Sequence, residues 1–255
     1  MAEQDNSSPQ INESMNPQNK TLSENPEPQL TAWQKIMYIF TNPNKTLATL
    51  RTNPTWLLPL LLIMAMTVIF TVATKDLMIE YRKEVILNSD KIPEEQKDLM
   101  LERMDNMTPK AYYIQSIGGG LVGLVLVYLF ASAIFIFVGN FILGGKASFK
   151  QIFSLYVWGN MVSLIELPVK GGLALAKGSA QVYTSLAVLM DPAQNKTVLF
   201  QLLNAVDVFN IWRIILWAIG FAYIYHFSPK KSYITVISIY VFYIFISIGL
   251  GRFFI

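Results

Sequence analysis

Apolar residues gather along the chain into long runs that short polar segments separate. Runs of about 20 apolar residues can cross a hydrocarbon core of roughly 30 Å as α-helices. The alternation of period two that marks an outer-membrane barrel is missing from these runs. We therefore predict an all-α integral membrane protein with five transmembrane helices, at about 54–74, 113–143, 149–168, 207–227 and 232–254.

The segment before the first run divides into two parts. Residues 1–30 are polar and hold few large apolar groups, so we expect a disordered tail. Residues 31–53 are predicted to form short amphipathic helices at the membrane interface, and Thr31 with Gln34 has the form of a capping box. Lys35 is expected on the polar face of the first helix. Packing of this helix on the protein's own spans is an equally good alternative.

Proline positions predict where several helices begin. The triplet Thr-Asn-Pro occurs at 41–43 and at 52–54. Asn is a good cap and Pro suits the first helical position, so we expect helices to begin at Pro43 and at Pro54, the latter being the first span. Thr108, followed by a proline, is a further predicted helix start. The third span is expected to stop at Pro168.

The polar connection at 75–112 carries seven Lys/Arg and nine Asp/Glu. Its first half has helical apolar spacing, and Pro93 followed by acidic residues is a typical helix start. We therefore predict an extramembrane helical hairpin between spans one and two. The chain at 169–206 is apolar but interrupted by Gly, Lys and Asp-Pro, which suggests partial or interfacial helices.

A few residues within or near the spans are candidates for function. Glu166 and Arg213 lie at similar expected depths on consecutive spans, and a buried charge is costly without a partner. We predict a structural ion pair between them; the alternatives are a proton or ion relay at this pair, or pairing of Glu166 with Lys170 alone. The candidate intramembrane polar cluster comprises Glu166, Arg213, Asn210, Asp207 and Lys170. Gly119 and Gly123 form a small-xxx-small pair that would let another helix approach closely.

Composition excludes several classes of function. The chain is 53% hydrophobic and 15% charged, with a net charge of +3 that gives no indication of nucleic-acid binding. It has no cysteine, which excludes disulfides and thiolate metal sites. The single histidine, His226, is expected to pack at a span end. No catalytic, metal-binding or cofactor-binding motif is present.

Several stretches together resemble the Yip domain family of membrane proteins (named for Ypt/Rab-interacting proteins), in its bacterial branch. They are "IFTNPNKTLATLRTNPTWLLPLLL", "IPEEQKDLMLERM", "GGKASFKQIFSLYVW" and "DVFNIWRIILWAIG". The resemblance implies a five-span bundle with a cytosolic amino terminus. Eukaryotic members interact with prenylated Rab GTPases, but their acidic-Leu-Tyr-Gly-Pro motif is missing here, so GTPase binding is not carried over.

Two hypotheses follow for the function. The first is a non-enzymatic protein of the bacterial inner membrane, with its amino terminus in the cytoplasm, that organises membrane-protein partners, self-associates or organises the bilayer. The alternative is a small permease or channel-like transporter that uses Glu166, Lys170, Asp207 and Arg213. An intramembrane enzyme is the least favoured, since nothing in the motifs specifies catalysis.

Overall fold

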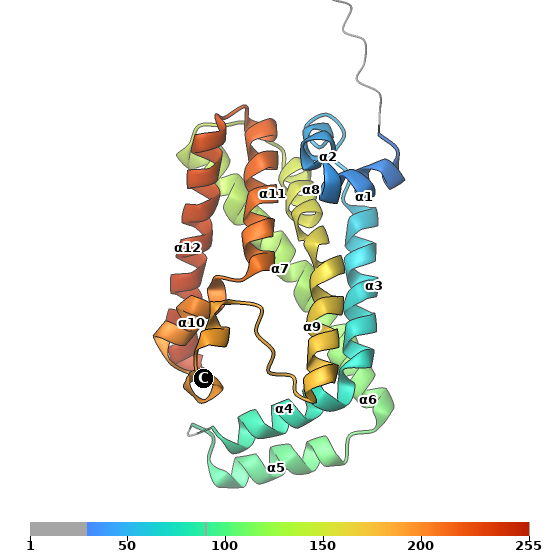
Figure 1. The fold of residues 1–255 in the computed structure, drawn as a ribbon, viewed down its shortest axis with the longest axis vertical. Coiled ribbons are helices and arrows are strands. Elements are labelled where there is room, and N and C mark those ends of the chain that lie inside the picture. The colour runs from blue at the N-terminus through green and yellow to red at the C-terminus, as the bar shows by residue number, and fades with distance from the viewer. Residues whose placement is uncertain (1–29, 90, 255) are drawn as a thin grey trace, which may run out of the picture.

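The long helices stand side by side in a bundle, with smaller helices at both ends (Figure 1). The computed structural model describes residues 30–89 and 91–254, and the regular elements in this part of the chain are all helical. The predicted disordered tail falls almost entirely on residues 1–29, outside the described residues. The bundle helices are α3 (Leu57–Ala73), α7 (Gly119–Ile136), α8 (Phe149–Gly159), α9 (Ser163–Lys177), α11 (Val208–Tyr225) and α12 (Pro229–Phe254).

Four helical stretches of the described chain are long and apolar enough to cross a membrane: Pro109–Ile142, Phe149–Lys177, Val208–Tyr225 and Pro229–Gly249. A fifth span is present if α3 is counted together with α4 (Lys75–Leu87), from which it is separated by a bend of 74°. These stretches match the predicted order of spans. The prediction of an all-α membrane protein is confirmed.

The two amino-terminal helices, α1 (Ala32–Thr41) and α2 (Pro43–Thr49), lie at one end of the bundle. The capping box is present, since the Thr31 hydroxyl accepts from the Gln34 N–H and the Gln34 side chain accepts from the Thr31 N–H. Through α2 this pair of helices packs against α11. The buried side of α1 therefore packs within the protein, as the alternative interpretation of this helix expected.

Lys35 is not on the exposed face of α1, contrary to the prediction. It is buried, and its Nζ lies 3.5 Å from the Thr55 hydroxyl. Trp33 and Met37 are the exposed large side chains of this helix. The helix turns its Lys35 and Ile39 face inward because α2 and the chain that follows it cover that side. Burial lowers the pKa of the Lys35 amine.

The first span begins three residues later than predicted. Residues 54–56 are not helical, and α3 begins at Leu57. The reason lies in the contacts of Thr55, whose carbonyl accepts a hydrogen bond of 2.6 Å from the Trp158 Nε1 and whose hydroxyl faces Lys35. A helix from Pro54 would withdraw that carbonyl into its own first turn.

The predicted hairpin is present as α4 followed by α5 (Glu94–Asp105), and it lies across the end of the bundle opposite α1 and α2 (Figure 1). Its two helices contact each other. The second span begins at α6 (Pro109–Tyr113), where Thr108 caps the Ala111 N–H as predicted. A π-helical turn leads into α7 and another, Phe137–Ile142, ends the span.

The third span does not stop at Pro168. It runs from α8 through a 3₁₀ turn, Asn160–Val162, into α9, and continues to Lys177 before Gly178 ends it with a φ of +66°. Proline removes one helical hydrogen bond, but packing against a neighbouring helix can hold a proline-containing segment in a helical conformation. That neighbour is α3, which packs against α9, and a Cβ at Gly171 would lie 3.3 Å from the Phe70 ring.

The prediction of partial helices at 169–206 describes residues 178–206 only, since 169–177 belong to the long helix α9. Residues 178–206 contain two 3₁₀ turns, Leu186–Leu189 and Pro192–Gln194, and then α10 (Val198–Ala205). In Figure 1 the lower end of α11 lies level with the first turns of α9, and α10 lies lower than α11. This arrangement decides which part of α9 faces the start of α11.

The core lies where α8 and α11 meet. Two glycines allow this close contact: a Cβ on Gly159 would lie 2.2 Å from the Trp217 Nε1, and one on Gly220 would lie 2.1 Å from Leu155. The Trp217 ring stacks on Tyr156 with a centroid distance of 4.7 Å. Small residues that let helix backbones approach are a common device in membrane bundles, where the hydrophobic effect does not drive helices together.

Candidate functional site

Four charged side chains form a connected cluster between α9 and α11. Arg213 on α11 donates to the carboxylate of Glu166 on α9. The other oxygen of Glu166 accepts from the Lys170 Nζ at 2.7 Å, and the same Nζ lies 3.3 Å from the Asp207 carboxylate. The charges alternate in sign along the chain of contacts and sum to zero. Each carboxylate therefore has at least one cation within ion-pair distance.

Neutral polar groups form further hydrogen bonds with the charged side chains of the cluster. Arg213 donates to the Asn210 side chain at 2.8 Å and to the Ser163 hydroxyl at 3.3 Å. Asp207 accepts from the Thr184 hydroxyl at 2.5 Å and, as the N-cap of α11, from the Phe209 N–H at 2.8 Å. These bonds tie α9, α11 and the segment before α10 to one another.

Burial makes these pairs energetically important. The side chains of Glu166 and Arg213 are 11% and 13% exposed, and that of Asp207 is 5% exposed. A buried charge left without its partner costs about 3–5 kcal/mol. The Arg213 Nε has no hydrogen-bond partner among the described residues. The cluster thus has one unfilled donor within an otherwise paired network.

The structure brings all five of the sequence-derived candidates together, but for a reason that differs from the depth argument. Glu166 lies in the first turn of α9 and not near the far end of the third span, since α9 continues to Lys177. The two residues meet because α11 begins part-way along α9, so that Arg213, in its second turn, faces the middle of the long third span. The ion pair was predictable from the cost of unpaired charge, whereas its height along the helix was not.

Ser163 and Thr184 were missed by the sequence reasoning. Ser163 lies one turn before Glu166, at a spacing that places both on one face of α9, so this signal was available. Thr184 lies in an irregular segment 23 residues before Asp207, and no periodicity connects the two. Its position follows only from the way the 178–206 segment folds back beside α11.

The charged side chains of the cluster form ion pairs between elements of the protein itself. In the described residues, no group of three or more His, Cys, Asp or Glu side chains could hold a metal ion. The single histidine is exposed at the end of α11, where His226 adopts a left-handed φ of +54°. Within the cluster the charged side chains pair with one another.

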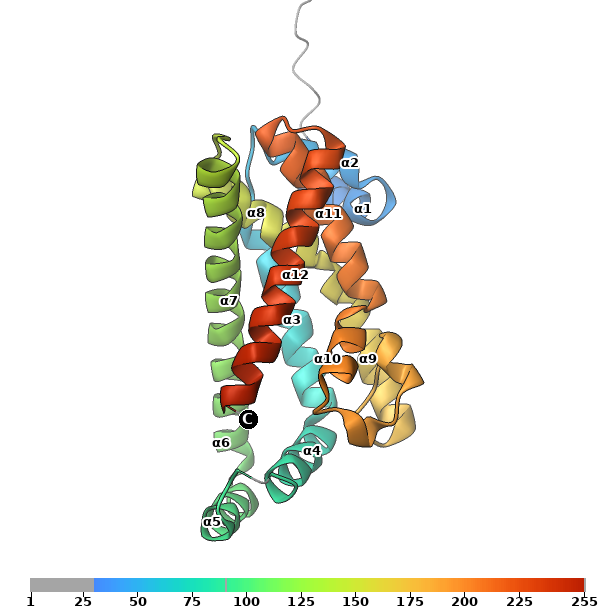
Figure 2. The same ribbon diagram turned by 90° about the vertical axis from the view of Figure 1, so that its left-hand side faces the viewer.

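Gly119 and Gly123 lie on the other side of the bundle, on α7. A Cβ at either position would meet nothing within 4 Å among the described residues, and the same holds for Gly118 and Gly120. Figure 2 shows α7 at the edge of the bundle. No described helix of this chain uses these glycines for a close contact, in contrast to Gly159.

Comparison with known proteins agrees with this architecture. The profile of the Yip1 domain matches residues 37–251, from α1 to the last helix. The chain belongs to the Yip1 domain family. It is also similar to the membrane protein YknW of Bacillus subtilis (strain 168), with 25% identity over 217 residues that cover 82% of this chain and 87% of YknW. No solved structure matches the chain. As a Yip1 domain protein with a bacterial relative, it is a multi-pass membrane protein of the bacterial branch expected from its motifs.

Proposed function

We propose that this Yip1 domain protein is a non-enzymatic membrane adaptor that holds another membrane protein against the glycine face of α7. The glycine face is centred on Gly119 and Gly123, which share one side of α7, and it is flanked by Gly120 and by Gly118, the last residue of the preceding π-helical turn. The observation that carries the proposal is the open space beside these four glycines. Glycine inside a helix costs roughly 0.5–1 kcal/mol relative to alanine, so four in six positions need a compensating contact.

The burial of the spans supports the same proposal. In the most apolar window of Pro109–Ile142, 17% of residues are buried, against 67% in Phe149–Lys177. Lipid can cover an apolar helix, and α12 is similarly open. Lipid gains nothing from a glycine surface, however, whereas a partner helix gains backbone contact there. The glycines therefore distinguish α7 as the docking helix.

The polar cluster supports an adaptor over the transporter. A permease site needs groups that are free to exchange partners with a solute. Here the two anions and two cations pair with one another, and Asp207 is further fixed by Thr184 and by the start of α11. The cluster holds the third and fourth spans in position, and that rigidity presents the outer helices in a fixed arrangement.

We further propose that the end of the bundle carrying α1 and α2 lies in the cytoplasm, in the inner membrane of a bacterium. The two short turns at that end, near 143–150 and 226–232, hold four lysines and no Asp or Glu. Short loops rich in basic residues favour the cytoplasmic side. Fusion of a periplasmically active reporter after residue 106, in the hairpin, should give activity, and a fusion at 146 should not.

In-cell crosslinking of the tagged full-length protein, followed by mass spectrometry of what co-purifies, tests the adaptor role. The variant carries Gly119→Leu and Gly123→Leu; overpacking costs about 1–3 kcal/mol, so recovery of the partner should fall about tenfold. The matched control carries Gly172→Leu and Ala176→Leu, an exposed small-xxx-small pair on α9. Equal recovery from variant and control, or recovery of the protein alone, would overturn the proposal.

A further inference from the structure

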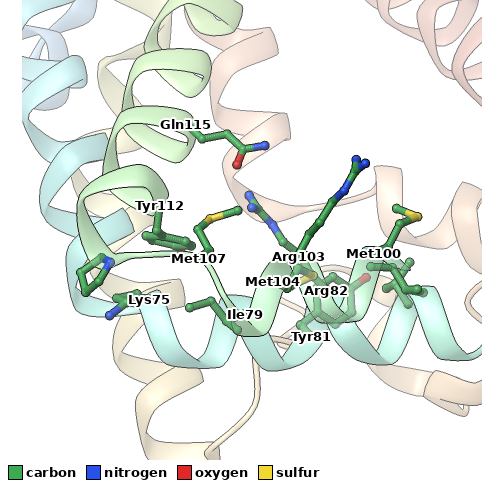
Figure 3. A pocket seen from close by; sticks show the side chains of 13 residues that line it. Lys75, Ile79, Tyr81, Arg82, Met100, Arg103, Met104, Met107, Tyr112 and Gln115 are labelled. Carbon is green, nitrogen blue, oxygen red and sulfur yellow. The ribbon is translucent and has the colours of Figure 1, made fainter. Parts of the chain in front are cut away.

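A cavity of about 600 Å³ lies between the hairpin and the start of the second span (Figure 3). Its walls come from α4, α5 and α6, together with Met107 between α5 and α6 and Gln115 of the π-helical turn. This volume lies within the range of clefts that hold small ligands. The lining residues that matter for its chemistry are Lys75, Ile79, Arg82, Met100, Arg103, Met104 and Met107.

The charges around this cavity are all of one sign. Lys75, Arg82 and Arg103 line it, and no Asp or Glu does, although the 75–112 connection contains nine acidic residues. Arg82 and Arg103 form no ion pair or side-chain hydrogen bond with any other described residue. Their neighbours on the same helices differ, since Lys83 pairs with Asp105 and Lys97 pairs with Glu94. The hairpin thus segregates two unpaired guanidinium groups to the cavity.

The rest of the wall is apolar and adaptable. Met100, Met104 and Met107 line it from α5 and the turn that follows, and Ile79 lines it from α4. Methionine side chains are flexible and polarisable, and they suit surfaces that fit irregular apolar ligands. Figure 3 shows both arginine side chains extending from the hairpin towards the side where Gln115 lies. The cavity therefore combines an apolar wall with a cationic rim.

The position of the cavity places it at the end of the spans. The apolar helix α3 ends at Ala73, immediately before Lys75, and the second span begins at Pro109, which also lines the cavity. Lipid headgroups meet protein at this level, and arginine binds phosphate through paired N–H donors. A ligand with a phosphate group and an apolar chain matches both the charge and the wall.

We propose that this cavity binds an anionic phospholipid from the leaflet on the hairpin side. Arg82 and Arg103 bind the phosphate, and the three methionines contact the glycerol and the first part of an acyl chain. The site lies on the hairpin, apart from the glycine face of α7. The proposal of lipid binding therefore does not depend on the adaptor role. A bound lipid would fix the hairpin, which otherwise meets the bundle through few helices, against the membrane surface.

Native mass spectrometry of the purified full-length protein, titrated with phosphatidylglycerol or with phosphatidylcholine, tests the lipid site. One basic residue near a membrane surface is worth about fivefold in affinity for anionic lipid, so Arg82→Gln with Arg103→Gln should weaken phosphatidylglycerol binding roughly 25-fold. The matched control is Lys83→Gln with Lys110→Gln, which removes the same charge outside the cavity. Circular dichroism checks that both variants retain the helical fold.

Two further binding measurements distinguish a lipid site from a site for free phosphate and from general charge attraction. Met104→Ser should weaken phosphatidylglycerol binding about tenfold, because it removes apolar contact without changing charge. Soluble sn-glycerol 3-phosphate should bind far more weakly than the lipid. Equal losses in the arginine variant and the lysine control would overturn the proposal. So would sn-glycerol 3-phosphate binding as tightly as the lipid, or phosphatidylcholine binding as tightly as phosphatidylglycerol.

Discussion

The ion pair between Glu166 and Arg213 gives the sharpest prediction on stability. Replacing Glu166 with Gln leaves Arg213 without an anionic partner, since Asn210, Ser163 and the new amide oxygen are all neutral acceptors. Replacing Arg213 with Gln leaves Glu166 with Lys170, which still neutralises it at 2.7 Å. Loss of the carboxylate should therefore destabilise the protein more than loss of the guanidinium.

The magnitudes follow from burial. Both side chains are nearly buried, and removing one partner of such a pair costs about 3–5 kcal/mol. We expect about 3 kcal/mol for Glu166→Gln and about 2 kcal/mol for Arg213→Gln, since Lys170 offsets part of the second. The double variant places two amides where two charges stood, so it should cost about 3 kcal/mol rather than the additive 5 kcal/mol.

Unfolding of the detergent-solubilised protein by a denaturing detergent, followed by tryptophan fluorescence, measures these differences. Trp212 and Trp217 lie on α11 beside Arg213 and report on its packing. The matched control is Asp105→Asn, which breaks the exposed pair with Lys83 and should cost below about 1 kcal/mol. It shows whether the assay separates buried from exposed pairs.

Additivity of the two single changes would refute this reasoning. If the double variant lost the sum of the single losses to within about 0.5 kcal/mol, the two residues would not be coupled. A larger loss for Arg213→Gln than for Glu166→Gln would instead show that Lys170 does not compensate for Glu166. Additivity would show that the Glu166–Arg213 pair does not stabilise the contact between the third and fourth spans, whereas the second result would refute only the role given to Lys170.

Two other substitutions test the packing. Gly159→Ala should lower the free energy of unfolding by about 2 kcal/mol, because the new Cβ meets Trp217. The control Gly172→Ala places its Cβ in open space and should not destabilise the protein. Equal effects of the two substitutions would contradict the close contact of α8 and α11. Lys35→Met should raise the melting temperature at neutral pH, where burial disfavours the ammonium form. Because the pKa of Lys35 is lowered in the folded state, wild-type stability should rise with pH from that lowered pKa up to about 10.4, the pKa expected for the unfolded chain. The advantage of Lys35→Met should shrink across that range, and a constant difference would show that the amine is not desolvated.

Local sequence signals located most helix starts. The Thr31 capping box and the Thr108 cap of α6 are present as predicted, and α2 begins at Pro43, although the Asn42 side chain makes no capping hydrogen bond. These devices succeed because the bonds they make lie within four residues of the chain. Charge and apolar length likewise sufficed for the order of spans and for the hairpin.

Helix ends and contacts that depend on distant parts of the chain could not be predicted from local sequence signals. Pro54 does not start α3, because Thr55 is held by Trp158, about a hundred residues away in the sequence. Pro168 does not end α9, because packing on α3 holds the helix together. The close contact at Gly159 depends on where Trp217 lies on another helix.

The adaptor role is tested most directly by photo-crosslinking from the glycine face of α7 in the native membrane. A photoreactive residue at Val122, which is 61% exposed and one turn from Gly119, would label whatever lies against this face. We predict a discrete adduct with a different membrane protein, lost when Gly119 and Gly123 are changed to Leu. Labelling of lipid only, or of a second copy of this chain only, would contradict the account.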